Sequence, residues 1–246
     1  MNVRKMWRYV LPVSLGVIAA VAIGTGTNAT AASGTKPLKI GIIGTGNIGG
    51  ALATHWAKAG HELLLSSRHP EELQALAKSL GPKVRVGTPQ EAAAFGDVIL
   101  LSVPYGATAQ IGKDLASIWK GKIVLDTGNP YPQRDGDMAV EARKQGTGVA
   151  SAAFLPGVRL VRAFNAIAWK SLKDEGNRAG EKYAIPLAGN DAEALAVAER
   201  LVRDAGFDPV VAGDLSHAKD FDFGTSVYVK LQTAAELRKT LGLPAK

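Results

Sequence analysis

A glycine-rich segment near residue 44 constrains the fold of this 246-residue chain more than any other feature. Residues 40–43 are mostly apolar, and the pattern G-x-G-x-x-G, formed by Gly44, Gly46 and Gly49, follows directly. Apolar residues then recur at helical spacing until Gly60, a residue type that commonly ends helices. A strand, a glycine turn and a helix in this order are typical of the first unit of a nucleotide-binding α/β sheet, whereas the glycines alone are weak evidence.

Each glycine of the pattern has its own predicted role. Gly44 makes the tight turn after the strand, Gly46 lets the backbone approach a pyrophosphate, and Gly49 lets the helix lie close to the sheet. The first amide groups of the helix then face the anion. The alternative is a glycine-rich turn that binds no ligand.

Short apolar segments alternate with helix signals from residue 38 onward. Strands are predicted at residues 38–43, 62–65, 84–86, 98–103, 123–126, 160–164 and 184–187. The pattern of a capping box with an early proline occurs at residues 88–91, and residues 190–193 and 233–236 repeat the spacing of cap and acid. Because parallel strands need crossover connections, this alternation predicts an α/β fold with a doubly wound, mostly parallel sheet of the Rossmann type. We expect this domain to cover residues 37–212, with a small C-terminal extension at 213–246 that ends in a helix from about residue 234 to residue 241.

The first 31 residues differ from the rest. Three basic residues precede an apolar run over residues 9–23, and small or polar residues follow around residues 28–31. This is the layout of a secretory signal peptide that is cleaved after residue 29 or 31. The alternative is an uncleaved N-terminal membrane anchor. Both interpretations predict that the remaining domain is exported, to the periplasm or the outside of the cell, and that only this segment meets a membrane.

Composition excludes several classes of site. The chain has no cysteine, which excludes disulfides, thiolate metal sites and a cysteine nucleophile. The four histidines never occur at metal-ligand spacing, so we predict no metal site. The net charge is +7, and it falls to about +4 without the leader, which is too mild to indicate nucleic-acid binding.

The end of the second predicted strand indicates which nucleotide is bound. NAD-binding chains usually carry an acidic residue there, at the position of Ser66 or Ser67, for the ribose hydroxyls. A carboxylate would repel a phosphate at the ribose 2′ position, whereas Ser67 can donate a hydrogen bond and Arg68 can bind the phosphate through two. The pattern therefore predicts NADP(H) rather than NAD(H). A compatible alternative is that residues 66–69 cap the next helix, which has Pro70 in its first turn.

Five motifs resemble a known family. They are GTGNIG at residues 44–49, SR at 67–68, LSVP at 101–104, DTGNP at 126–130 and AFNAI at 163–167. In this order, over about residues 38–211, they resemble the NADP-dependent oxidoreductases of coenzyme F420, a deazaflavin. The cytosolic domain of the six-transmembrane epithelial antigen metalloreductases, which passes hydride from NADPH to a flavin, is similar too. The resemblance implies NADP(H) as cofactor and coenzyme F420 or a flavin as co-substrate.

The resemblance also implies which residues bind the cofactor. Each set follows a predicted strand at its carboxyl end, where ligands bind in open α/β sheets. The implied residues are Gly44, Thr45, Gly46, Asn47, Ile48 and Gly49 at the pyrophosphate, Ser67 and Arg68 at the 2′-phosphate, Ser102, Val103 and Pro104 beside the nicotinamide ribose, Asn129 and Pro130 after the fifth strand, and Asn165 and Ile167 where the nicotinamide meets its partner. An ordinary turn is the alternative at Asn129 and Pro130.

The chain departs from the family at two places. Some members place a further basic residue for the phosphate near Glu71 or Glu72, where this chain has acids. After Gly213, no motif indicates a deazaflavin site.

Hydride transfer between two stacked rings requires positioning but no protein acid or base, so we predict no catalytic side chain. An alternative is an NADPH-dependent reductase of a small carbonyl substrate, with a proton donor in the pair Lys173 and Asn177 or near His217 and Asp220. A second alternative, from another class, is a nucleotide-binding sensor or scaffold without turnover. The predicted partner is a small-molecule hydride acceptor, and a homodimer is the oligomeric state we consider.

Overall fold

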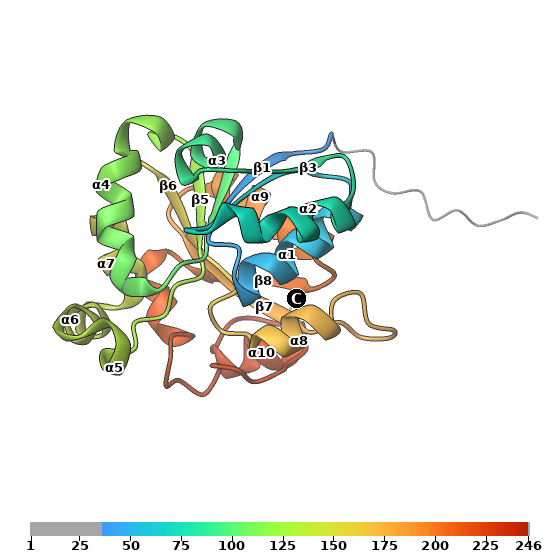
Figure 1. Cartoon of the computed structure of the whole chain (residues 1–246). Helices are drawn as coiled ribbons and strands as arrows, with labels where there is room; N and C mark the ends of the chain where they lie inside the picture. Colours follow the sequence, from blue (N-terminus) through green and yellow to red (C-terminus); the bar gives the residue numbers. More distant parts are fainter. Residues whose placement is uncertain (1–35, 246) are drawn as a thin grey trace, which may run out of the picture. The chain divides into compact units, whose positions relative to one another are not determined.

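A computed structural model describes residues 36–245, and it contains one eight-stranded sheet (Figure 1). The predicted leader at residues 1–31 lies outside the described residues. The strands are β1 (Lys39–Ile43), β2 (Glu62–Ser66), β3 (Val84–Gly87), β4 (Val98–Leu101), β5 (Ile123–Asp126), β6 (Arg159–Arg162), β7 (Ala184–Gly189) and β8 (Asp208–Gly213). Their order is β3-β2-β1-β4-β5-β6-β7-β8. All neighbours pair in parallel except β6 and β7, which are antiparallel.

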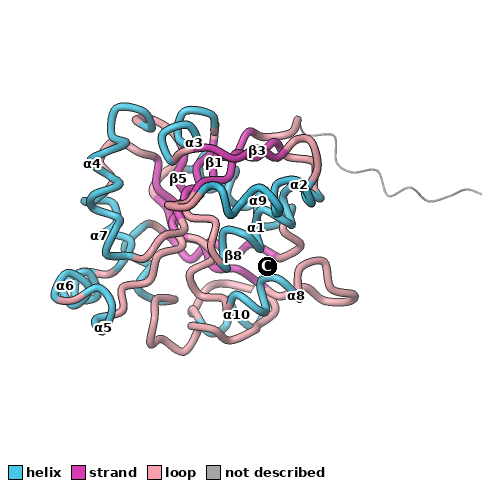
Figure 2. The backbone as a smooth tube through the Cα atoms, in the orientation of Figure 1, coloured by secondary structure: helices cyan, strands magenta, loops and turns pink. Residues whose placement is uncertain are grey.

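Helices cover both faces of the sheet (Figure 2). They are α1 (Asn47–Lys58), α2 (Gln74–Leu80), α3 (Pro89–Phe95), α4 (Thr108–Trp119), α5 (Pro132–Asp135), α6 (Asp137–Gln145), α7 (Thr147–Phe154), α8 (Trp169–Asp174), α9 (Ala192–Asp204) and α10 (Ala234–Thr240). Short 3₁₀ segments lie at η1 (Pro70–Leu73), η2 (Tyr105–Ala107) and η3 (Leu215–Asp220). Figure 1 shows α4 and α7 on one side and α1, α2 and α9 on the other. The predicted fold class is therefore confirmed.

Alternation along the strands separates two main cores. Ile42 and Leu100 belong to the cluster that α1 and α9 cover, whereas Ile43 and Leu101 belong to the cluster that α3, α4 and α7 cover. Since successive side chains of a strand point to opposite faces, a strand buried on both sides is apolar throughout. This is why the central strands could be predicted from their sequence.

The helix boundaries mostly follow the predicted caps. Thr88 and Thr233 each form a complete capping box with the glutamate three residues later. At the third site the cap is Asp191, which accepts a hydrogen bond from the amide of Ala194, and not the preceding asparagine. Helix α1 ends at Lys58, and Gly60 follows with a φ of +90°.

The structure corrects three strand assignments. The strand predicted at 98–103 ends at Leu101, because the chain turns before Pro104, which has no amide to donate to the sheet. The strand predicted at 160–164 is found at 159–162, because Phe164 adopts a left-handed conformation with a φ of +59°. Strand β8 was not predicted, since Pro209 and Gly213 resemble turn residues there. As an edge strand, β8 tolerates the proline.

Residues after β8 pack against β7 and β8. A third hydrophobic cluster contains Ala188 and Val210 from these strands and Phe221, Val227 and Leu237 from the C-terminal extension. Within residues 36–245 no helix is long and apolar enough to span a membrane. The same residues contain no group of three or more side chains arranged to hold a metal ion.

Candidate nucleotide-binding site

The loop between β1 and α1 requires glycine at its first position. Gly44 has a φ of +94°, and a Cβ there would lie 2.2 Å from the carbonyl oxygen of Ser102. The loop is held against β2, because the amides of Gly44 and Thr45 both donate to the carbonyl of Ser66, at 3.0 Å. The hydroxyl of Thr45 donates to the same oxygen at 3.1 Å. The predicted turn at Gly44 is therefore present.

The other two glycines have different surroundings. A Cβ on Gly49 would lie 2.3 Å from the carbonyl oxygen of Gly44, so the helix approaches its own loop closely. A Cβ on Gly46 would meet nothing within 4 Å. Packing inside the protein thus explains Gly44 and Gly49, whereas Gly46 faces open space.

Helix α1 begins without a side-chain cap. Its N-cap is Gly46, its first turn has no acidic residue, and its first backbone hydrogen bond joins the amide of Gly50 to the carbonyl of Gly46, at 2.7 Å. The amide groups of Asn47 and Ile48 lie in this first turn, where a helix has no internal partner for them. An uncapped N-terminus beside open space can receive a phosphate.

The segment after β2 combines a turn with an unpaired cation. Ser66 is fully buried, and its hydroxyl donates to the carbonyl of Ile42 at 2.8 Å, so this serine supports the sheet. The Ser67 hydroxyl accepts a hydrogen bond from the amide of His69 at 3.0 Å, which leaves its own proton available to a ligand. Arg68 is exposed and makes no side-chain hydrogen bond or ion pair with the described residues. The capping interpretation is not supported, because His69 is the N-cap of η1 and no side chain makes a capping hydrogen bond there. The geometry is compatible with a phosphate contact.

The loops after β4 and β5 lie beside the glycine loop. The amide of Ser102 donates to the carbonyl of Ile43 at 2.8 Å, and the amide of Thr127 donates to the carbonyl of Leu101 at 3.1 Å. Val103 is half-buried and Pro104 is exposed. The three loops therefore form one continuous edge.

Two predicted asparagines contact each other although they are far apart in the sequence. The side-chain amide of Asn129 donates to the backbone carbonyl of Asn165 at 2.8 Å. Asn165 is only 2% exposed and directly follows the left-handed Phe164. Pro130 and Ile167, the other predicted residues of these two segments, are buried.

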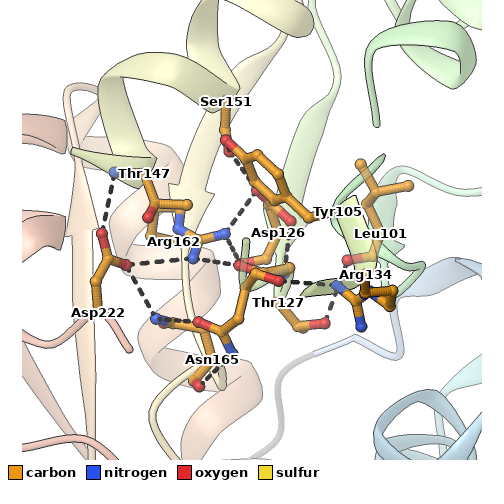
Figure 3. A network of polar contacts seen from close by, with 12 residues as sticks. Leu101, Tyr105, Asp126, Thr127, Arg134, Thr147, Ser151, Arg162, Asn165 and Asp222 are labelled. Carbon is orange, nitrogen blue, oxygen red and sulfur yellow. Dashed lines mark hydrogen bonds and ion pairs between the residues drawn. The ribbon is translucent and has the colours of Figure 1, made fainter. Parts of the chain in front are cut away.

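A buried ion pair that was not predicted lies behind these loops (Figure 3). Arg162 at the end of β6 donates to the Asp126 carboxylate at 2.6 Å, and neither side chain is more than 1% exposed. Arg162 also donates to the carbonyl of Gly128 at 2.6 Å, and the hydroxyl of Ser151 donates to Asp126 at 2.7 Å. The pair thus fixes the turn that carries Asn129. A charged residue inside the apolar segment 160–164 was the signal that could have revealed it.

The pKa values of two groups in this network, Arg162 and Tyr105, are raised above their usual values. Burial by itself would lower the pKa of Arg162, but the charges of Asp126 and Asp222 outweigh it, and the pKa lies above its usual value. Burial raises the pKa of Tyr105, whose hydroxyl lies 3.2 Å from that of Ser151, to about 12. Neither group can exchange a proton near pH 7, so this network positions the loops and does not act as an acid or base.

The C-terminal extension contributes an aromatic group that was also not predicted. The hydroxyls of Tyr131 and Tyr228 are 2.5 Å apart, and the ring of Phe223 contacts both rings edge-on, at centroid distances of 4.9 and 5.2 Å. Arg134 lies over Tyr131 and donates to the carbonyl of Asn129. No family motif covers residues after 213, which is why sequence reasoning missed this group.

The two residue pairs considered as proton donors for carbonyl reduction, Lys173 with Asn177 and His217 with Asp220, lie in ordinary structural surroundings. Lys173 is an exposed residue of α8, and Asn177 occupies a turn with a φ of +60° whose amide donates to the carbonyl of Gly206 at 3.2 Å. His217 and Asp220 form an exposed pair with each other, at 2.9 Å.

Apart from these alternatives, every predicted site residue lies at one edge of the sheet. Each follows the carboxyl end of β1, β2, β4, β5 or β6 or belongs to the start of α1. The strand order turns back at β1, since β2 and β4 flank it, and such a point is where open α/β sheets bind ligands. The fold and this loop define a Rossmann-type α/β protein with the glycine loop of the nucleotide-binding class.

Comparison with known proteins shows what this chain is similar to. Residues 39–130 match the family described as NADP oxidoreductase, coenzyme F420-dependent. The F420-dependent NADP reductase of Methanothermobacter marburgensis is 28% identical over 215 residues, which are 82% of this chain and 95% of that protein. The chain is therefore related to the coenzyme F420-dependent NADP oxidoreductases and shares their Rossmann fold, as its motifs indicated.

Two further relatives extend the comparison. The metalloreductase STEAP3 of Rattus norvegicus is 28% identical over 187 residues, which are 75% of this chain and only 36% of that protein. The chain thus spans about a third of the length of this relative. A crystal structure of a hypothetical protein from Sinorhizobium meliloti is 26% identical, with a TM-score of 0.67, over 80% of this chain and 96% of that one.

Proposed function

We propose that this protein is an NADP(H)-dependent oxidoreductase that transfers a hydride between nicotinamide and coenzyme F420 or a flavin-type acceptor. The observation that carries the proposal is the uncapped start of α1 at Gly46, with the unpaired Arg68 at the neighbouring strand end. The names of the relatives support both halves of it, since they specify NADP and coenzyme F420.

The residues present fit NADP(H). The amides at the start of α1 would bind the pyrophosphate, and the absence of a side chain at Gly46 leaves room for it. Ser67 and Arg68 would bind the 2′-phosphate, and Ser102 with Val103 would border the nicotinamide ribose. When bound, the nicotinamide supplies the hydride chemistry, and the protein supplies position and the exclusion of water.

The acceptor side is formed by different residues. Asn129 is hydrogen-bonded to Asn165 at the end of the sheet. The aromatic group of Tyr131, Phe223 and Tyr228 lies beside Asn129. A flat ring can stack on aromatic side chains. Burial raises the pKa of Tyr228, as it does for Tyr105, so neither hydroxyl titrates near pH 7. Direct hydride transfer needs no protein acid, whereas reduction of a carbonyl needs one.

The decisive experiment is an NADPH oxidation assay with four acceptors in parallel: coenzyme F420, FMN, FAD and a ferric chelate. The ferric chelate is included because one relative is a metalloreductase. We expect turnover with coenzyme F420 or a flavin, and at most slow turnover with small aldehydes and ketones. Tight NADPH binding without turnover of any acceptor would replace this proposal with a sensor or scaffold.

A further inference from the structure

A cavity with unusual lining lies beside the acceptor side of the site. Its volume is about 130 Å³. It is lined by Pro130, Arg143, Thr147, Lys219, Asp222 and Thr225, among others. Asp222 contacts the side-chain amide of Asn165 at 3.4 Å (Figure 3). Because Pro130 directly follows Asn129, the cavity shares its wall with the predicted nicotinamide end of the site.

Two buried hydroxyls of this lining have no partner in the protein. Thr147 is fully buried, and neither its Oγ1 nor the buried Oγ1 of Thr225 makes a hydrogen bond with the described residues. Two neighbours share this property, because the Arg162 Nε and the Asn165 Oδ1 are also buried without a partner. An unsatisfied buried polar atom destabilises a protein by about 1–3 kcal/mol, so such atoms rarely gather without an occupant.

The charges around the cavity favour an anion. Arg143 and Lys219 are exposed at its rim. The Asp222 carboxylate is engaged elsewhere: it accepts from the amide of Thr147 at 3.0 Å and lies 3.6 Å from the buried guanidinium of Arg162. Arg162 is shared between Asp126 and Asp222, so these three groups together carry one negative charge, and the two rim cations leave the surroundings of the cavity with a net positive charge.

We propose that this cavity is an oxyanion subsite that holds a phosphate or carboxylate group of the hydride acceptor. A cavity of about 130 Å³ has room for one such group, given that a water molecule occupies roughly 30 Å³ in the liquid. Arg143 and Lys219 supply the charge, and the hydroxyls of Thr147 and Thr225 supply the hydrogen bonds. The oxyanion subsite stands on its own geometry, whereas its assignment to the acceptor rests on the proposed function.

Binding of inorganic phosphate to the full chain tests the subsite. Isothermal titration calorimetry is carried out in saturating NADP⁺. The nucleotide occupies the glycine loop, so added phosphate cannot bind there. We expect one phosphate per chain, bound about tenfold more weakly after Lys219→Gln or Arg143→Gln, because a charge-assisted hydrogen bond contributes about 1.5 kcal/mol. Lys113→Gln, at an exposed lysine of α4 outside the cavity, is the matched control. Absence of phosphate binding, or equal binding by all variants, overturns the proposal.

Thr147→Val separates ligand binding from folding. Removal of a buried hydroxyl without a partner leaves the thermal midpoint unchanged or raises it, because no hydrogen bond of the protein is lost. The same variant is expected to bind phosphate several-fold more weakly. A normal phosphate affinity in Thr147→Val shows that the hydroxyl does not face the anion, which contradicts the subsite as drawn.

A comparison of FMN with riboflavin tests the assignment to the acceptor, because the two share a ring and differ in one phosphate. In a fluorescence-quenching titration we expect FMN to bind about tenfold more tightly than riboflavin, and Lys219→Gln to abolish the difference. If phosphate binds but FMN and riboflavin bind equally, the subsite holds a free oxyanion and its assignment to the acceptor fails. If neither flavin binds while phosphate does, the flavin part of the proposed function fails and the oxyanion subsite stands.

Discussion

Arg68 is the residue on which the choice between NADP(H) and NAD(H) depends. It is exposed and has no ionic partner among residues 36–245, although Glu71 and Glu72 follow closely. Arg68→Ala is expected to weaken NADPH binding by roughly 1.5–3 kcal/mol, the contribution of a charge-assisted contact, and to leave NADH binding nearly unchanged. Fluorescence titration with both nucleotides measures this. Arg203→Ala, at an arginine of α9 that pairs with Glu199, is the control. Equal losses for the two nucleotides would refute the role of Arg68.

His61 makes stability depend on pH through a contact far from the site. Its Nδ1 accepts from the amide of Leu38 at 3.0 Å, so its other nitrogen carries the proton and donates to Asp204 at 3.0 Å. Burial lowers the pKa of His61 below 6.5, although the hydrogen bond to Asp204 opposes this shift. A lowered pKa in the folded state means that the unfolded chain binds the proton more readily. The stabilising contribution is therefore complete above pH about 6.5 and is lost as the pH falls through the folded pKa.

His61→Gln is the test of this dependence. The substitution is expected to reduce stability at pH 7.5 by about 1–3 kcal/mol, because Leu38 and Asp204 lose their partner. We also expect the thermal midpoint of this variant to fall less than that of wild type when the pH is lowered from 7 to 5. His69→Gln, at a side chain that is 64% exposed, is expected to keep the wild-type decline. Parallel declines in wild type and His61→Gln would show that another group is responsible.

At the scale of elements, the glycine loop combines a folding requirement with a binding requirement. Gly44→Ala places a methyl group 2.2 Å from a backbone oxygen in a left-handed conformation, so we expect destabilisation of at least about 2 kcal/mol. Gly46→Ala places it in open space, so we expect the free energy of unfolding to fall by only about 1 kcal/mol, the cost of alanine at an N-cap, while NADPH binding weakens tenfold or more. Thermal unfolding and nucleotide titration of both variants check this. If Gly46→Ala binds NADPH normally, the pyrophosphate lies elsewhere.

Elements with a strong local signal could be predicted from the sequence. The seven predicted strands exist. The central strands β1, β4 and β5 are buried on both faces and consist of apolar residues apart from Lys39 at the start of β1 and Asp126 at the end of β5. The caps at Thr88 and Thr233 are local patterns and were located correctly. Strand β8 has only three apolar residues between a proline and a glycine, and it is a strand because β7 pairs with it.

Contacts between distant segments could not be predicted in the same way. Asn129 and Asn165 were each identified by their motifs, but their hydrogen bond depends on the register of β5 and β6. Asp222 is 57 residues from Asn165 and has no motif. Its position depends on how the chain after β8 folds back. The glycine loop is therefore a property of one continuous segment, whereas the acceptor side is a property of the tertiary fold.

At the scale of the whole molecule, the predicted leader raises a question of compartment, because NADPH is a cytosolic compound. We propose that residues 1–31 direct export and that cleavage follows residue 29 or 31. Expression with a C-terminal tag in a bacterial host is expected to yield a periplasmic protein that begins at residue 30 or 32, as measured by mass spectrometry. Leu15→Arg interrupts the apolar run and is expected to retain the chain in the cytoplasm. An intact N-terminus on periplasmic material would favour the membrane anchor instead.

The C-terminal extension is expected to be required for folding and not only for binding the acceptor. Phe221, Val227 and Leu237 are each at most 3% exposed, and they cover Val210 of β8. Burial of one such side chain contributes about 1.5–3 kcal/mol, so the loss of three is comparable with the 5–15 kcal/mol stability of a typical domain. Truncation after Gly213 is therefore expected to abolish cooperative thermal unfolding in circular dichroism. Removal of residues 244–246 is the control. Among the described residues it costs the hydrogen bond from Arg238 to the Pro244 carbonyl, and the shortened chain is expected to unfold like wild type. A truncated chain that unfolds cooperatively and still binds NADPH would show that the sheet folds by itself, and the extension would then serve the acceptor alone.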